Sequence, residues 1–126
     1  MYTSNPYNIY KQNSVNMASS QQLLLMLLDG AVKYTKIARL AILDKNIAKA
    51  HKELIRVQDI FLELMITMDK NTNYMEDLYN VYDFIKNELV RANMTKDIKV
   101  IDEVLPLIEE IRDMWHEVDK KIKSGK

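Results

Sequence analysis

The fold is decided by a stretch that reads SSQQLLLMLLDGAVKYTKIARLAILDKN from residue 19 to residue 46. Ser19 is a good N-cap, and Gln22, three residues later, completes a capping box. Apolar side chains then recur every three or four residues, which places them on one face of a helix. We therefore predict a helix over residues 20–43 whose core face holds Leu23, Leu27, Ala31, Tyr34, Ile37, Ala38 and Ala41.

The same signals predict three further helices, over residues 47–70, 73–92 and 96–122. Their predicted N-caps are Asn46, Asn73 and Thr95. Short connections between helical segments place consecutive helices side by side and antiparallel. The predicted fold class is therefore all-α, an antiparallel up-down-up-down four-helix bundle.

The inward faces of these three helices follow from the same period. The helix over 47–70 is predicted to face inward with Ala50, Leu54, Val57, Phe61, Leu64, Met65 and Met68. The helix over 73–92 does so with Leu78, Val81, Tyr82, Ile85 and Leu89, and the helix over 96–122 with Val100, Val104, Ile108, Ile111, Trp115, Val118 and Ile122. Pro106 lies inside the last helix and lacks the N–H that an interior position donates. Because the apolar period continues in phase across it, we expect a kink near residues 102–105 and not a helix end.

Two terminal segments differ from the bundle, which is predicted to span residues 19–122. Residues 1–18 hold Pro6, three tyrosines and many asparagines and serines, and they form an N-terminal arm that is either mobile or docked on the bundle. Residues 123–126 are predicted to be a frayed tail.

The composition excludes several classes of protein. The chain has 126 residues with eighteen basic and eighteen acidic side chains, so it lacks the basic excess that phosphate binding favours. It has no cysteine, which excludes disulfides, thiolate nucleophiles and cysteine-bound zinc. The first residues do not resemble a signal peptide, and the longest apolar run, residues 23–28, is too short to span a bilayer. We expect a cytoplasmic protein that binds neither nucleic acid nor membrane.

No constellation of residues points to catalysis. His51 and His116 lack the paired histidine and carboxylate ligands that zinc proteases and di-iron bundles require. The serines lie in the arm or at the first cap, and the two glycines build no phosphate loop. We expect no enzyme activity, no cofactor, no metal and no small-molecule substrate.

The helices carry more apolar residues than one narrow bundle seam requires. At 100° per residue, several apolar residues fall outside the main inward stripes. They are Leu25, Leu28, Val32 and Leu43 on the first helix, Ile55, Leu62 and Ile66 on the second, and Tyr79 and Phe84 on the third. Exposed apolar area of this kind marks a partner site, covered by the arm, by a second copy or by a foreign helix. Eight methionines, with Met65, Met68 and Met75 near one connection, favour an adaptable surface.

The chain resembles the flagellar secretion chaperone FliS family along nearly its whole length. The residues that carry the resemblance are Met1-Tyr2, Asn5-Pro6-Tyr7, Tyr10 and Val15, then Ala18-Ser19 with Leu23 to Leu28 and Asp29-Gly30-Ala31, then Ala50-His51, Leu54-Ile55-Arg56, Gln58-Asp59-Ile60 and Glu63-Leu64, then Leu78, Tyr82, Phe84, Leu89 and Ala92-Asn93, and Ile111-Arg112-Asp113, Trp115 and Glu117. It departs from the family before the first helix, where a proline is replaced by Ser20.

The resemblance implies a cytosolic export chaperone specific for flagellin. Such a chaperone binds the disordered C-terminal region of flagellin, prevents premature polymerisation and aids delivery to the flagellar type III export gate, one of whose components is a further candidate partner. It also implies that an arm gates the binding groove, a role that falls here on Tyr7 and Tyr10, and more weakly on Tyr2 and Val15. The candidate client-binding residues are Leu25, Leu28, Val32, Ile55, Leu62 and Ile66. The alternative is a self-associating helical-bundle adaptor without a secreted client.

Overall fold

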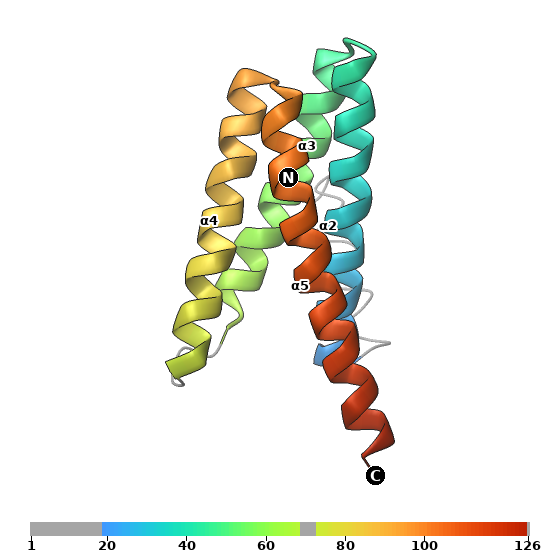
Figure 1. Cartoon of the computed structure of the whole chain (residues 1–126), viewed down its shortest axis with the longest axis vertical. Helices are drawn as coiled ribbons and strands as arrows, with labels where there is room; N and C mark the ends of the chain where they lie inside the picture. The colour runs from blue at the N-terminus through green and yellow to red at the C-terminus, as the bar shows by residue number, and fades with distance from the viewer. Residues whose placement is uncertain (1–18, 69–72, 126) are drawn as a thin grey trace, which may run out of the picture.

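The computed structural model describes residues 19–68 and 73–125, and within them every element is an α-helix. The helices are α2 (Ser20–Leu43), α3 (Ile47–Ile66), α4 (Asn73–Thr95) and α5 (Ile98–Ser124). Each helix packs on the next along the chain, and α5 closes the ring by packing on α2, whereas the backbones of α2 and α4, and of α3 and α5, do not approach each other closely. The predicted all-α, four-helix arrangement is confirmed (Figure 1).

The first two helices begin where their caps predicted. The Ser19 hydroxyl accepts the N–H of Gln22, and the Gln22 side chain accepts the N–H of Ser19, each at 3.1 Å. The Asn46 side chain accepts the N–H of Lys49 in the same way at the start of α3. These bonds satisfy N–H groups that a helix N-terminus otherwise leaves without partners.

Four other boundaries differ from the prediction: α3 ends earlier, α4 ends at Thr95 and not at residue 92, and α5 starts at Ile98 and ends at Ser124 and does not span 96–122. Helix α3 ends at Ile66 and not at residue 70; Thr67 is its C-cap, and the N–H and hydroxyl of Thr67 both donate to the Glu63 carbonyl. Helix α5 is capped by Asp97, whose carboxylate accepts the N–H of Lys99. Thr95, the predicted cap, is the last residue of α4 and accepts the N–H of Asp97. Pro106 lies inside α5 and does not end it.

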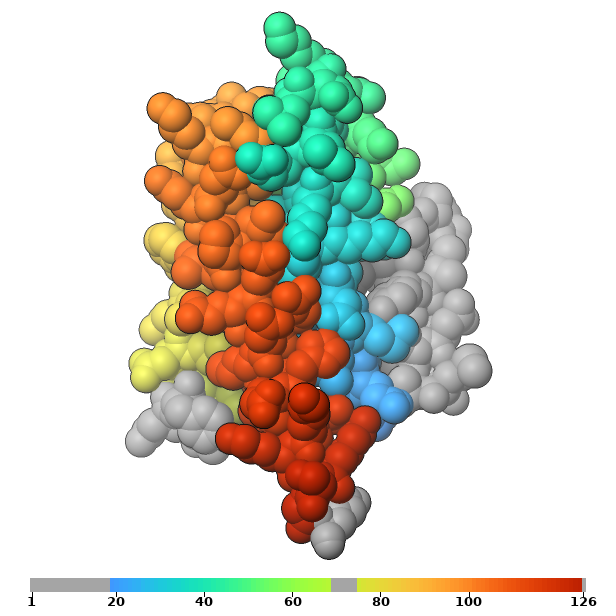
Figure 2. Space-filling model, turned by 45° about the vertical axis from the view of Figure 1, so that its right-hand side comes forward, coloured from blue at the N-terminus to red at the C-terminus, as the bar shows by residue number. Residues whose placement is uncertain are grey.

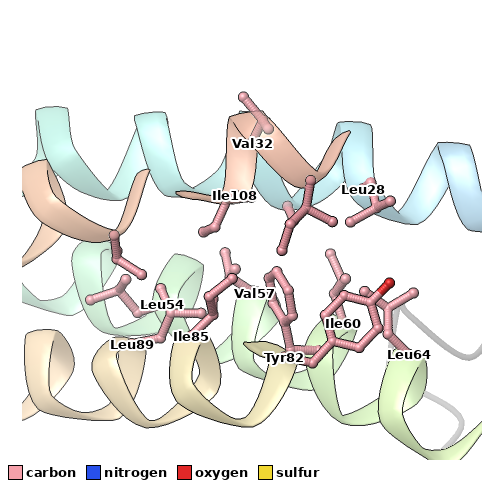
Figure 3. Packing of buried hydrophobic residues seen from close by; sticks show 14 of the residues in the cluster. Leu28, Val32, Leu54, Val57, Ile60, Leu64, Tyr82, Ile85, Leu89 and Ile108 are labelled. Atoms are coloured by element: carbon pink, nitrogen blue, oxygen red, sulfur yellow. The ribbon is translucent and has the colours of Figure 1, made fainter. Parts of the chain in front are cut away.

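The core runs along the centre of the bundle and draws on all four helices (Figure 3). Its largest fully buried side chains are Tyr82, Phe61, Leu28, Leu54, Ile85, Leu89, Ile101, Ile108, Val57, Val104 and Thr35. The Thr35 hydroxyl donates to the Ala31 carbonyl, so its burial leaves no donor without a partner. Burial of these apolar side chains is the main force that holds the helices together.

Two residues predicted to face inward are exposed. Val81 is 42% exposed and Ile122 is 56% exposed. Ile122 continues the apolar stripe of α5, but α5 extends past the ends of its neighbours, so no helix lies against this turn (Figure 1). Val81 lies at the edge of the buried stripe of α4, between Tyr82 and the outer surface. Helical period identifies a face but not how much of that face a neighbour covers.

Replacing Leu54, which is fully buried, by alanine removes core contacts and leaves a cavity. We predict that Leu54→Ala lowers the free energy of unfolding by about 2–5 kcal/mol. The matched control is Leu40→Ala on α2, where the side chain is 59% exposed and the expected change is below about 1 kcal/mol. Urea unfolding followed by circular dichroism measures both, and equal effects would contradict this core.

Candidate functional site

A row of apolar side chains lies on the outside of α3. Ile55, Leu62 and Ile66 are 37%, 42% and 74% exposed, and their spacing of seven and four residues places them in one narrow sector of the helix. We call these three residues the α3 strip. Next to it, His51 is hydrogen-bonded to Asn93 of α4, which places the strip on the α4 side of the outer face. The structure therefore confirms the predicted exposed shoulder on α3.

Asp59 interrupts the α3 strip between Ile55 and Leu62. Partial burial raises the pKa of the Asp59 carboxyl above its ordinary value, since nearby apolar atoms disfavour the charged form. A helix laid over this strip would remove more water from the same carboxylate. The strip is therefore an apolar contact surface with one carboxyl group, Asp59, whose burial costs free energy while it is charged.

The predicted outward residues of α2 are placed differently. Leu28 is fully buried and Val32 is 4% exposed, and both belong to the main core cluster. Leu25 is also buried, although it is not part of that cluster. The prediction that these three side chains project away from the bundle is wrong. Because α2 packs against both α3 and α5, it buries a wider stripe than a single seam needs.

The tyrosines to which the arm's gating role was assigned, Tyr7 and Tyr10, lie outside the described residues, as does Val15. The two alternatives for the arm, mobile or docked on the bundle, therefore concern residues outside the described part of the chain. Leu43 and Phe84, also predicted to lie outside the core stripes, are both exposed.

An apolar pocket opens at the end of the bundle where α2 begins and α3 ends. Its volume is about 340 Å³, and its described lining is Ser20, Gln21, Leu23, Leu24, Leu27, Glu63, Leu64, Thr67, Met68, Met75, Leu78, Tyr82 and Trp115. In this lining the indole Nε1 of Trp115 donates to the Tyr82 hydroxyl oxygen at 3.1 Å. Burial raises the pKa of the Tyr82 hydroxyl, partly offset by this hydrogen bond.

The sequence did not reveal this pocket, although it contained one signal. Met68 and Met75, on either side of the α3–α4 connection, were noted as a cluster of adaptable side chains, and both line the pocket. The side-chain nitrogen of Gln21 is buried there without a hydrogen-bond partner among the described residues. The pocket is thus mainly apolar, with a few polar side chains such as Ser20, Gln21 and Thr67 in its wall, which suits an apolar side chain of a bound protein.

Ion pairs on the exposed surface join α2 to α5, which run side by side in Figure 2. They are Arg39–Asp102 at 2.6 Å and Lys36–Glu109 at 3.5 Å, and a hydrogen bond between His116 and Asp29 at 2.8 Å joins the same two helices. The hydrogen bond from Arg39 lowers the pKa of the Asp102 carboxyl. Exposed pairs contribute little stability, so their main effect is to set the register of the two helices.

The described residues contain no group of three His, Asp or Glu side chains placed to hold a metal ion. None of the helices in this part of the chain is long and apolar enough to cross a membrane. Residues 19–68 and 73–125 contain an exposed apolar row and an apolar pocket, and features of these two kinds are typical of sites where proteins bind partners by burying apolar surface.

Comparison with known proteins gives one consistent family. Residues 3–122 match the family described as flagellar protein FliS. A Bacillus subtilis protein named flagellar secretion chaperone FliS is 35% identical over 115 residues, which cover 91% of this chain and 86% of that protein. The Salmonella typhimurium protein of the same name is 30% identical over 128 residues, with 96% and 95% covered.

A solved structure described as a flagellar chaperone from bacteria has a similar fold. It superimposes with a TM-score of 0.74 and covers 92% of this chain and 96% of that chain at 14% identity. At this identity the likeness concerns the fold alone. The family resemblance inferred from the sequence is confirmed by the family match and by the two relatives.

The raised pKa of Asp59 predicts a dependence of stability on pH. At about pH 7 the folded state carries a partly desolvated carboxylate, and this cost disappears once the group is protonated in both states. We expect Asp59→Asn to raise the urea midpoint at about pH 7 and to leave it close to that of the parent at about pH 3. A gap that is constant between the two pH values would show that charge on Asp59 is not the cause.

Proposed function

Because the chain belongs to the FliS family of flagellar proteins, we propose that it is a chaperone that binds the C-terminal region of flagellin in the cytoplasm. Bound there, the client is kept from polymerising and is delivered to the flagellar type III export gate. The client segment is disordered as a monomer and becomes helical when it packs. The family is one of chaperones, which are not enzymes.

The observation that supports a helical client is the α3 strip. From Ile55 to Ile66 it spans twelve residues, a rise of about 16 Å of helix at roughly 1.5 Å per residue. An amphipathic helix presents apolar residues with the same spacing, so a client helix can lie along α3 and cover Ile55, Leu62 and Ile66 together. The bundle does not use these side chains in its own core.

The energetics of such a contact favour binding of moderate strength. Full burial of a Leu or Ile side chain contributes about 1.5–3 kcal/mol. The three strip residues are already partly covered, so each contributes less. Ordering a disordered client costs roughly 2–5 kcal/mol or more. The favourable free energy of burial therefore exceeds the cost of ordering the client by only a small amount, which suits a chaperone that must release its client at the export gate.

The N-terminal arm has a proposed part in this cycle. Tyr7, Tyr10 and, more weakly, Tyr2 and Val15 close the client surface in the free protein and move aside when flagellin docks. The apparent affinity for the client then falls in proportion to the time that the surface is closed. Leu28 and Val32, which are core residues, are not part of the proposed contact surface.

Two substitutions test the α3 strip. We predict that Leu62→Ser with Ile66→Ser weakens binding of a flagellin C-terminal peptide at least about tenfold, because the client loses two apolar contacts. Both side chains are exposed, so the helical content is expected to stay unchanged. Calorimetric titration measures the affinity.

The control for this test is Leu40→Ser, an exposed leucine on α2 outside the strip, which should bind the peptide as the parent does. Light scattering of the free parent protein should show a monomer. A constitutive dimer dissociated by the double substitution would favour the self-associating adaptor instead.

The arm is tested by Tyr7→Ala with Tyr10→Ala. We predict unchanged helicity and faster, tighter binding of the flagellin peptide, because the client surface is closed for less of the time. Stopped-flow fluorescence measures the rate. Deleting residues 1–18 should have the same effect in a larger degree, and unchanged rate and affinity in both variants would rule out gating by the arm.

A further inference from the structure

The surface between α4 and α5 carries a second apolar patch, separate from the α3 strip. Phe84 and Val81 on α4 are 53% and 42% exposed, and Met114 on α5 is 42% exposed. Leu107 of α5 is partly buried and packs against the core beside them. Figure 1 shows α4 and α5 splaying apart from the connection that joins them. We call these four side chains the α4–α5 patch.

Two contacts fix how α4 lies against α5. The Arg91 guanidinium lies 3.8 Å from the Glu103 carboxylate near one end, and Trp115 donates its hydrogen bond to Tyr82 near the other. In antiparallel helices this register places Val81 level with Met114, and Phe84 between the levels of Leu107 and Met114. The four apolar side chains therefore lie at neighbouring levels along the α4–α5 side of the bundle.

Carboxylates border this patch along α5 and at its two ends on α4. At 100° per residue, Glu103, Glu110 and Glu117 flank it on α5, whereas Asp77 and Glu88 share the sector of Val81 and Phe84 and lie beyond them along α4. Arg91 lies near two of these carboxylates, 2.7 Å from Glu88 and 3.8 Å from Glu103, and Lys99 and Lys121 occupy the same sector of α5 beyond the two ends of the row of glutamates. The rim of the α4–α5 patch is therefore negative, although the formal charge of the whole chain is zero.

We propose that the α4–α5 patch binds an amphipathic helix of a partner protein whose apolar face is flanked by Lys and Arg residues. Apolar side chains of that helix cover Phe84, Val81 and Met114, and its cations reach the carboxylates that border the patch. From Asp77 to Arg91 the patch and the charges at its ends cover fifteen residues of α4, a rise of about 21 Å, which is roughly four turns of a bound helix. Opposite charges around an apolar centre select the partner and speed its association.

This assignment is independent of the proposed flagellin client. The α3 strip has Asp59 within it, whereas the α4–α5 patch has an apolar centre and a charged rim, so the two surfaces select different partners. The patch is also on a different pair of helices from the strip, so occupation of one surface leaves the other accessible.

Two designed peptides of about 16 residues provide the test, since that length matches about four helical turns. Both carry leucines on one helical face and alanines elsewhere. On the two sides of the leucine face, one peptide carries lysines and the other carries glutamates. Trp115, the single tryptophan of the chain, lies beside the patch and reports binding by its fluorescence. We expect the lysine-flanked peptide to bind the full-length protein at least about tenfold more tightly at low salt, with affinity falling as salt rises.

Two variants locate the binding site. Phe84→Ser removes the centre of the patch and Glu110→Lys reverses charge on its rim, and each should weaken the lysine-flanked peptide at least about fivefold. Leu40→Ser and Asp44→Lys make the same two changes at exposed sites elsewhere and should leave binding unchanged. Circular dichroism checks that all four variants are folded.

Three outcomes would overturn the proposal. The first is equal affinity for the two peptides, and the second is binding that neither Phe84→Ser nor Glu110→Lys weakens. The third is a dimer of the free protein that Phe84→Ser converts to a monomer, which would identify a second copy of the chain as the occupant. None of these results depends on flagellin, so the flagellin proposal stands or fails separately.

Discussion

Tyr82 joins three of the four helices at the level where the bundle begins to open. It is 1% exposed, packs edge-on against Phe61 of α3 at 5.8 Å between ring centres, and accepts the indole hydrogen bond of Trp115 from α5. A buried hydroxyl without a partner would cost free energy, so the tyrosine and the tryptophan require each other. On one side of this contact the core is closed, and on the other lies the apolar pocket.

In this bundle, the residues that stabilise the fold differ from the apolar residues that are exposed on its surface. Leu54, Ile85 and Ile108 are fully buried and hold the helices together, whereas Leu62 and Phe84 remain accessible on the outside. Exposed apolar side chains lower the solubility of a protein, and here they are interrupted by a charge within the α3 strip and bordered by charges around the α4–α5 patch. The bundle therefore presents apolar rows to partners without weakening its own packing.

The sequence predicted the features that depend on local interactions. Ser19 with Gln22, and Asn46, fix the starts of α2 and α3 through bonds within one turn, so a single segment contains the whole signal. The burial of Leu28 and the exposure of Ile122 depend on where neighbouring helices lie and end, which a periodic pattern does not contain. The pocket was missed for the same reason, because its walls come from all four helices. The exposed row on α3 was predicted because three residues of one helix define it.

The two exposed surfaces differ in the force that would select a partner. A partner that covers the α3 strip removes water from apolar side chains and from Asp59. The free energy gained from burying the apolar side chains changes little with salt or becomes more favourable. Covering the α4–α5 patch depends also on the carboxylates of Glu103, Glu110 and Glu117, whose attraction for cations salt screens within about 10 Å. Affinity at the second surface should therefore fall with ionic strength under conditions where the first still binds. A chaperone with both surfaces can hold a client on one while a basic partner helix exchanges on the other, because the helices that carry them are fixed by a core that neither partner touches.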